Sequence, residues 1–143
     1  MPQYTDITNA TVTVEHIGGI DHCELSVSPG ITVLMGRNAT NRPSFLRAVA
    51  GVLGGSAATV KSDADEGAVK LDLNGETYTR HYARRNGETV ATGGAPYTEH
   101  SNLVDLFACI LETNPARRAV ERGDDIRDVI MRPVDTDEIQ ERI

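Results

Sequence analysis

The residues best suited to chemistry lie in the stretch GRNATNRPS, residues 36–44. A glycine, several turn-forming residues, an arginine and a proline come directly before the helix-like run PSFLRAVAGVL. Backbone amides at the start of a helix point toward bound anions, and the helix dipole favours negative charge there. The stretch therefore predicts a phosphate-binding corner formed by Gly36, Arg37, Asn38, Ala39, Thr40, Asn41, Arg42, Pro43 and Ser44.

This stretch departs from the P-loop pattern G-x-x-x-x-G-K-[ST] at three positions. Asn41 stands for the second glycine, Arg42 for the lysine and Pro43 for the serine or threonine. Asparagine tolerates the left-handed conformation and Arg42 keeps the positive charge, but Pro43 lacks both an amide donor and the hydroxyl that holds Mg²⁺. Ser44 comes one residue late, about 100° around the helix. Three interpretations of residues 36–44 remain open: a working phosphate site, an altered phosphate site, or an ordinary turn between a strand and a helix.

Hydrophobic patterning predicts the elements that position this corner. Alternating runs at 7–17 and 20–27 indicate two strands joined by a Gly-Gly turn. The apolar run ITVLM at 31–35, bounded by glycines, is typical of a strand buried on both faces. The apolar stripe that follows predicts a helix over 43–53, which Gly54-Gly55 ends.

The rest of the chain is expected to form a hairpin region and then helices. After a polar connector at 56–67, two Asn-Gly steps predict a three-stranded antiparallel meander over 68–92. Helical patterning follows at 101–112, from Asn114-Pro115, at 124–131 and from Asp135 to the end of the sequence.

Residues 10–55 resemble the N-terminal head segment of the SMC and DNA-repair ATPases of the ABC class. The residues that carry the resemblance are Pro29-Gly30-Ile-Thr-Val-Leu, Gly36-Arg37-Asn38, Ser44-Phe45-Leu46-Arg47-Ala48 and Val52-Leu53-Gly54. The variant loop Asn-Ala-Thr-Asn-Arg-Pro-Ser and the helical tail from Asn114 make the chain similar to the archaea-specific SMC-related proteins of halophiles.

The resemblance implies an α/β (α+β) fold, the N-terminal lobe of a P-loop, ABC-type ATPase head within a single domain, residues 1–143. Strands, P-loop and first helix would occupy 1–55, the antiparallel meander 56–97, and helices leading toward a coiled coil 98–143. It also implies ATP as the ligand of residues 36–44, while the missing hydroxyl at position 43 argues against a standard Mg²⁺ site. The implied partners are the C-terminal lobe of the same head, a second head in a head–head dimer, and DNA.

The later motifs of that class, Walker B and the signature motif, are not found in this sequence, and its Q-loop glutamine is not identifiable. The chain alone is therefore not expected to be a complete ATPase, and no catalytic residue is assigned. The alternative is a degenerate, non-catalytic structural head that mediates assembly.

Composition places the chain among acidic proteins. The formal net charge is −7, the excess lies within residues 63–143, and only Lys61 and Lys70 among the 14 basic residues are lysines. Such a balance resembles proteins of a salt-saturated cytoplasm, and it requires any DNA contact to be local. The sequence has no membrane-length apolar run or secretory leader, which predicts a cytoplasmic protein without membrane association.

Two groups of arginines and the two cysteines are the remaining candidates. Arg80, Arg84 and Arg85 could contact DNA or nucleotide phosphates, or they could balance charge on a solvated sheet face. Helix-face pairing with Glu121 and Asp125 is the simpler interpretation of the second arginine group, Arg117, Arg118 and Arg122. The cysteines and histidines have no metal-ligand spacing, so Cys23 and Cys109 are expected to be buried thiols.

Overall fold

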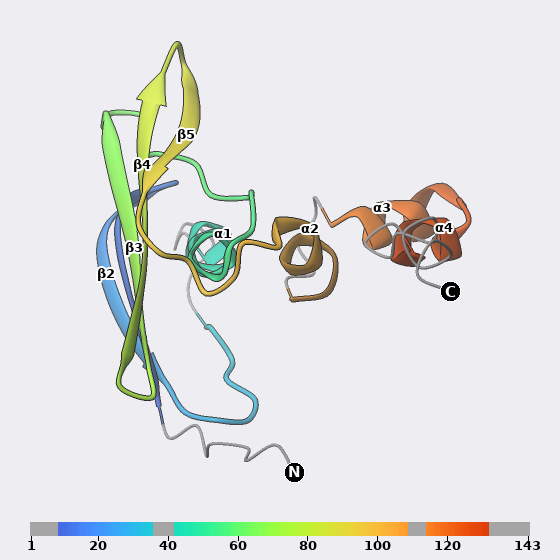
Figure 1. Cartoon of the computed structure of the whole chain (residues 1–143), viewed down its shortest axis with the longest axis horizontal. Helices are drawn as coiled ribbons and strands as arrows, with labels where there is room; N and C mark the ends of the chain where they lie inside the picture. Colours follow the sequence, from blue (N-terminus) through green and yellow to red (C-terminus); the bar gives the residue numbers. More distant parts are fainter. Residues whose placement is uncertain (1–8, 36–41, 109–113, 132–143) are drawn as a thin grey trace, which may run out of the picture.

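The computed structural model describes residues 9–35, 42–108 and 114–131. Its elements are β1 (Ala10–Ile17), β2 (Ile20–Val27), α1 (Arg42–Leu53), β3 (Glu66–Leu73), β4 (Glu76–Arg85), β5 (Glu88–Gly93), α2 (Ser101–Leu103), the π-helix η1 (Val104–Ala108), α3 (Pro115–Arg122) and α4 (Ile126–Met131). Figure 1 shows them in successive layers, with the sheet at one side, α1 against it, then α2, and finally α3 and α4. The fold is mixed α/β, as expected.

All five strands form one antiparallel sheet in the order β2-β1-β3-β4-β5. The predicted meander is confirmed as β3, β4 and β5, and the N-terminal hairpin joins the same sheet because β1 pairs with β3. Val14 lies in the middle of the sheet, opposite Cys23 on β2 and Val69 on β3. The sheet therefore links the strands on both sides of the predicted phosphate-binding stretch.

Two Asn-Gly turns set the register of the meander. Asn74 and Asn86 have φ of 51° and 54°, and Gly75 and Gly87 both have φ of 79°. Positive φ at both central residues defines a type I′ turn, whose twist matches that of the flanking strands. The hairpin signal read from the sequence was therefore correct at both positions.

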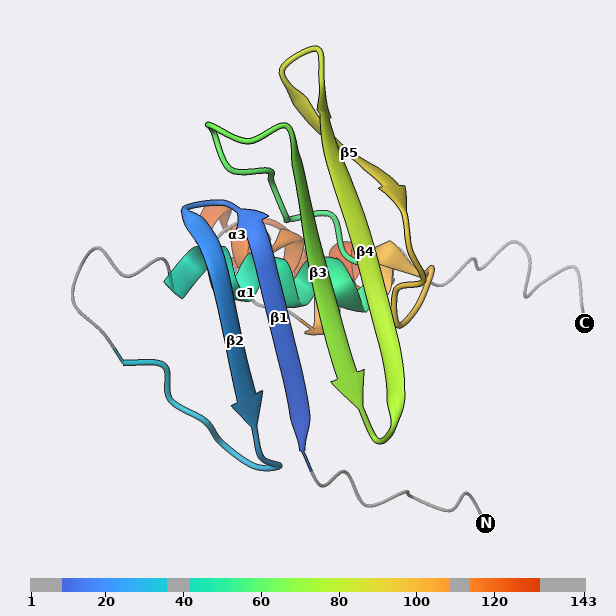
Figure 2. The same cartoon turned by 90° about the vertical axis from the view of Figure 1, so that its left-hand side faces the viewer.

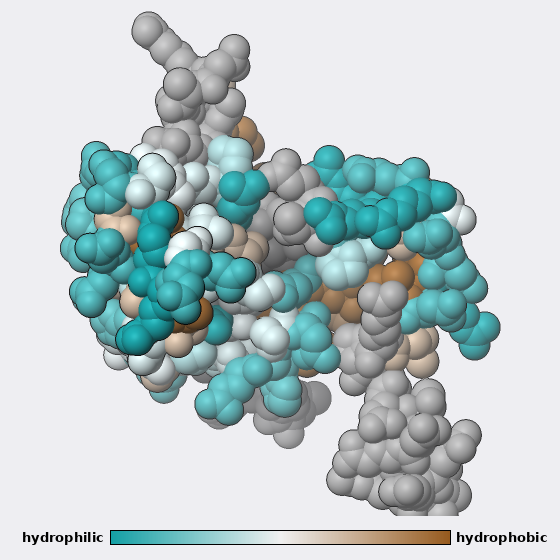
Figure 3. All heavy atoms as spheres, turned by 90° about the horizontal axis from the view of Figure 1, so that it is seen from above, coloured by the Kyte–Doolittle hydropathy of each residue, from teal (hydrophilic) through white to brown (hydrophobic). Residues whose placement is uncertain are grey.

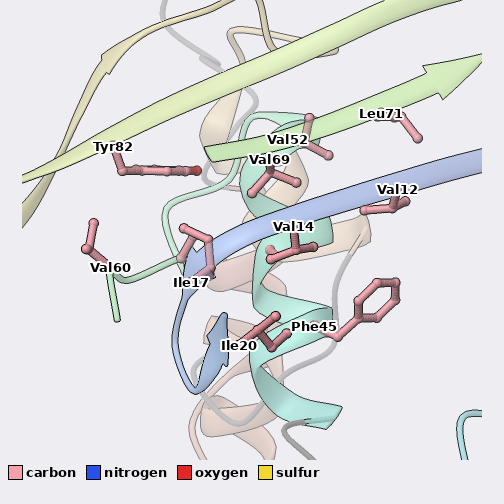
Figure 4. Packing of buried hydrophobic residues seen from close by; sticks show 12 residues of the cluster. Val12, Val14, Ile17, Ile20, Phe45, Val52, Val60, Val69, Leu71 and Tyr82 are labelled. Atoms are coloured by element: carbon pink, nitrogen blue, oxygen red, sulfur yellow. The ribbon is translucent and has the colours of Figure 1, made fainter. Parts of the chain in front are cut away.

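Helix α1 covers one face of the sheet and supplies much of the core. Figure 2 shows it crossing behind the strands. Phe45, Ala48 and Val52 are buried along one stripe of the helix, and in Figure 4 Phe45 and Val52 lie among sheet residues such as Val14 and Val69. The predicted helix over 43–53 is confirmed to within one residue.

The predicted buried strand at 31–35 is wrong for this chain. No strand is assigned there, and the side chains of Ile31, Val33 and Met35 are 98%, 72% and 87% exposed. A strand buried on both faces needs neighbouring strands for its backbone groups and apolar layers for its side chains. No other strand among the described residues pairs with this segment, which leaves the edge strand β2 and runs outside the sheet in Figure 2.

The C-terminal helices agree with the sequence only in part. The predicted helix at 101–112 is described as α2 and η1 up to Ala108. Asn114 caps α3 as predicted, and Gly123, with φ of 75°, ends it. Helix α4 lies within the predicted 124–131 range, whereas the helix predicted from Asp135 lies outside the described residues. Within the described part of the chain, no helix combines the length and apolar character needed to cross a membrane.

Candidate functional site

The predicted phosphate-binding stretch is described only at its helical end. Gly36, Arg37, Asn38, Ala39, Thr40 and Asn41 lie outside the described residues, as does the side chain of Arg42. Arg42 begins α1, Pro43 follows it with an exposed ring, and Ser44 is buried. The first turn of α1 thus offers one amide donor fewer than usual, because proline has no N–H.

Ser44 fastens the start of α1 to the turn between β1 and β2. Its Oγ accepts a hydrogen bond from the backbone N–H of Gly19 at 3.2 Å. Gly18 has φ of 58°, and a Cβ at this position would overlap Ser44 Oγ. The hydroxyl that comes one residue late in the P-loop pattern is therefore occupied by a structural contact.

An acidic hollow of about 600 Å³ opens beside the same turn. It is lined by His16, Asp21, Asp63, Ala64, Asp65 and Glu66. Phosphate would be repelled by these carboxylates, so the hollow does not extend the predicted corner toward an anion. No group of three or more histidine, cysteine or acidic side chains within the described residues is arranged to hold a metal ion.

Lys61 neutralises part of this acidic cluster. Its Nζ lies 3.2 Å from an Asp21 carboxylate oxygen and also contacts the carboxylate of Asp63. Hydrogen bonds to Asp63 and Asp21 raise the pKa of Lys61, and the same ammonium group lowers the pKa of Asp63. Lys61 therefore ties the segment before β3 to the first residues of β2.

An apolar groove of about 330 Å³ lies between α1 and the sheet. Its walls come from β1, the end of β2, β3, α1 and the 31–35 segment: Ala10, Val12, Val27, Thr32, Leu34, Phe45, Leu46, Val49, Leu53, Leu71 and Leu73. Leu34 lines this groove while its neighbours Val33 and Met35 are exposed. The segment therefore alternates as a strand would, with one row of side chains against the groove and the other in solvent.

Two of the arginines considered for phosphate contact bind backbone carbonyls instead. Arg80 Nη1 donates to the carbonyls of Gly51 and Gly55 at 3.1 and 3.0 Å, which places its charge at the C-terminal end of α1. Arg84 Nη2 donates to the carbonyls of Val60 and Lys61 at 3.2 and 2.6 Å. The interpretation of this pair as charge balance on a solvated face was therefore wrong, whereas contact with DNA or nucleotide phosphates stays a prediction.

The alternation of residues along β4 could have indicated that Arg80 and Arg84 face the core side of the sheet. Tyr78, Arg80, Tyr82 and Arg84 alternate along β4, so they share one face of the strand, and Tyr82 on that face is buried. Arg85 points to the other face and is exposed.

The outcome for the other candidates is mixed. Arg117 pairs with Glu121 at 3.1 Å, four residues further along α3, as predicted. Asp125 instead accepts the backbone N–H of Arg127. Cys23 is a free, half-buried thiol, whereas Cys109 lies outside the described residues.

Comparisons with known proteins place the chain in context. It is 51% identical, over all 143 residues, to the Smc-like protein Sph2 of Halobacterium salinarum, and 54% identical over 134 residues to the Smc-like protein Sph3 of Haloferax volcanii. The chain is homologous to the haloarchaeal SMC-like proteins. A third SMC-like relative, Sph1 of Halobacterium salinarum, is 29% identical over 92% of the chain.

The resemblance to halophilic, archaeal SMC-related proteins is thereby confirmed. The chain spans only about a fifth of the length of these SMC-like relatives, 20% to 23%. No family model matches it, and no solved structure matches it.

Proposed function

We propose that this chain is the N-terminal nucleotide-binding lobe of an SMC-like chromosome-maintenance or DNA-repair ATPase. Residues 36–44 would bind the phosphates of ATP, with Arg42 as the charge partner at the start of α1. Support comes from the SMC-like relatives and from the order of elements, in which a hairpin and an extended apolar segment lead into the corner and α1 follows it.

The observation that carries the proposal of a lobe is the exposed row of Ile31, Val33 and Met35. Exposing three large apolar side chains on one side of a segment has an unfavourable free energy, about 25 cal/mol for each Å² of apolar surface in water. The alternation of the segment fits a strand that gains partners from elsewhere, and the relatives are about five times as long as this chain. The C-terminal lobe of the same head would supply those strands and the layer that covers the row.

Ser44 and Pro43 favour a second candidate, a degenerate head that serves assembly without catalysis. Pro43 brings neither hydroxyl nor amide donor, and the hydroxyl of Ser44 already accepts the N–H of Gly19. A metal ion would have to be held without either group, so this candidate predicts that Mg²⁺ adds nothing to nucleotide binding.

ATP binding by the full-length protein in concentrated salt tests both candidates. We expect wild type to bind ATP and Arg42→Ala to bind it at least about tenfold more weakly, because a charge-assisted contact to phosphate is lost. Arg127→Ala, which removes an exposed arginine from α4, is the matched control and should bind ATP as wild type does.

Equal affinities of wild type and Arg42→Ala would contradict the role of Arg42, and absence of ATP binding in wild type would contradict the phosphate site itself. Repeating the titration with and without Mg²⁺ then separates the two candidates. A gain in affinity and ATP turnover with Mg²⁺ would favour the ATPase, while binding indifferent to Mg²⁺ without turnover would favour the structural head.

A further inference from the structure

The C-terminal end of α1 is bound to the π-helix η1 through one carboxylate. Asp105 Oδ1 accepts the backbone N–H of Ser56 at 2.9 Å, and Asp105 Oδ2 accepts the Ser56 hydroxyl at 2.6 Å. Gly55 leaves room for this contact, because a Cβ there would lie 2.7 Å from Asp105 Oδ1. Hydrogen bonds to an ionised carboxylate are among the stronger ones in proteins, so this pair fixes the distance between α1 and η1.

Asn114 makes the next connection, from η1 to α3. It is 2% exposed, and its Nδ2 donates to the carbonyls of Asp105 and Leu106 at 2.9 and 3.0 Å. Its Oδ1 accepts the N–H groups of Ala116 and Arg117 at 2.9 and 3.1 Å, which caps α3. Both N–H donors and both acceptor positions of the amide are therefore used. These hydrogen bonds join η1 to α3.

The element between these two contacts is a π-helix. π-Helices are rare overall, and those that occur are often found at functional sites. Here the carbonyls of Asp105 and Leu106 bind Asn114, while the side chain of Leu106 packs with Ala119 and Val129. Figure 1 shows α2 and η1 lying between α1 and the α3–α4 pair.

We propose that Ser56, Asp105 and Asn114 form a polar joint that couples α1 mechanically to α3 and α4. Helix α1 is held at its C-terminal end by Arg80 and by the amides of Tyr97 and Thr98, which donate to Val52 and Leu53 at 2.9 and 3.0 Å. A shift of α1 therefore displaces Ser56 and, through the joint, the cap of α3. Insofar as the shift is caused by ATP at residues 36–44, this inference rests on the proposed function.

Hydrogen exchange followed by mass spectrometry on the ligand-free, full-length protein tests the joint. Asn114→Asp keeps an acceptor that can cap α3 but removes both Nδ2 donors and turns a carboxylate toward carbonyl oxygens. We expect exchange to become roughly tenfold faster both in residues 54–58 and in residues 115–122. Asn102→Asp, the same change at an exposed position of α2, is the matched control and should leave both segments unchanged.

Asp105→Ala breaks the joint from the other side and should give the same paired response. If it accelerates exchange only in residues 54–58 and leaves 115–122 as in wild type, the two ends are independent and the proposal is overturned. If Asn114→Asp unfolds the protein, hydrogen exchange of Ser56→Ala tests the joint in its place. Faster exchange at 115–122 supports the joint, and unchanged exchange there overturns it.

Addition of ATP provides the arm that depends on the proposed function. We expect ATP to slow exchange at 115–122 in wild type, and Asp105→Ala to abolish this effect while binding ATP within about twofold of wild type. ATP binding without any change at 115–122 in wild type would overturn the coupling and leave the phosphate site standing. No ATP binding would contradict the phosphate site, and the ligand-free measurements would then decide the joint alone.

Discussion

At the scale of single residues, the start of α1 depends on the absence of a side chain at Gly18. The turn that it forms is pressed against Ser44, whose hydroxyl binds the next amide. Glycine is required there for two reasons, the positive φ of 58° and the close approach to Ser44.

Gly18→Ala should therefore destabilise the protein by about 2–5 kcal/mol, the cost of a left-handed alanine plus the steric overlap. The control is Gly87→Ala, which also has a positive φ but meets no atom within 4 Å. It should cost only about 1–2 kcal/mol. Denaturant unfolding of both variants checks the difference, and equal losses would show that the contact with Ser44 is not tight in solution.

At the scale of elements, the sheet and α1 are held together by side chains that the sequence does not obviously assign to packing. Arg80 illustrates this, because it reaches from β4 to two carbonyls at the C-terminal end of α1 and its guanidinium lies 5.7 Å from the ring centroid of Tyr82.

Arg80→Met should destabilise the protein by about 1–3 kcal/mol, since two carbonyls lose a charged donor and the helix end loses a favourable charge. Arg85→Met, on the same strand but exposed, is the matched control and should change stability by less than about 0.5 kcal/mol. Thermal or denaturant unfolding compares the two. A similar effect of both substitutions would mean that the carbonyl contacts of Arg80 contribute nothing.

The connector before β3 gives a prediction with a defined pH dependence. Lys61 lowers the pKa of Asp63 below its usual 3.8, so the folded state holds the charged carboxylate more strongly than the unfolded state does. The resulting stabilisation is present above pH 3.8 and is lost as the pH falls through the lowered pKa of Asp63.

Unfolding of wild type and Lys61→Met between pH 6 and pH 2.5 tests this sign. Wild type should be the more stable of the two at pH 6, and the difference should shrink below pH 3.8. Lys70→Met is the comparison: the pKa of its partner Asp72, 3.4 Å away, is lowered first by the hydrogen bond from Thr77 and then by Lys70, so the same trend should appear in weaker form. A difference that grows toward low pH would contradict the assignment.

Most of the helices and strands could be predicted from the sequence. The hairpins, the meander, α1 and the cap at Asn114 follow from alternation, Asn-Gly steps and a helical stripe, which are local signals. The roles of Arg80 and Arg84 depend on which face of β4 the helix covers. The joint through Asp105 depends on contact with Ser56, 49 residues away. Such long-range partners are set by packing, and spacing along the chain does not reveal them.

The predicted strand at 31–35 failed for a related reason. Its apolar composition is typical of a buried strand, but Ile31, Val33 and Met35 are exposed. Burial needs other chain segments, and the described residues supply a groove for one face only. Local composition indicates that a segment is apolar, but it does not reveal which other segments lie against it.

At the scale of the whole molecule, the row of Ile31, Val33 and Met35 makes a prediction about the full-length protein. Val33→Asp should destabilise it by about 2–4 kcal/mol if the row is covered there, since a carboxylate would be buried without a partner. Val120→Asp on α3, where the valine is 65% exposed, is the matched control and should cost about 1 kcal/mol or less. Equal effects on the unfolding midpoint would contradict a covered row.

Apolar side chains are also prominent beyond the sheet. Figure 3 shows hydrophobic atoms among hydrophilic ones on the side of α3 and α4, and Phe107, Ile126 and Ile130 are exposed there. The buried cluster here consists of Leu106, Ala119 and Val129, with Ala116 packed against it, and its small size limits how firmly α3 and α4 are held. Polar contacts such as those of Asn114 therefore matter more for this pair of helices than for α1.

The use of Arg80 and Arg84 as carbonyl ligands changes how the charge of the molecule should be counted. A formal sum treats every arginine as available to surrounding ions, but these two guanidinium groups are largely turned inward. The surface that water and dissolved salt meet is therefore rich in carboxylates, in line with the formal net charge of −7. Such a surface binds hydrated cations, and the folded state should lose stability as the surrounding salt is diluted, because these carboxylates then repel each other unscreened.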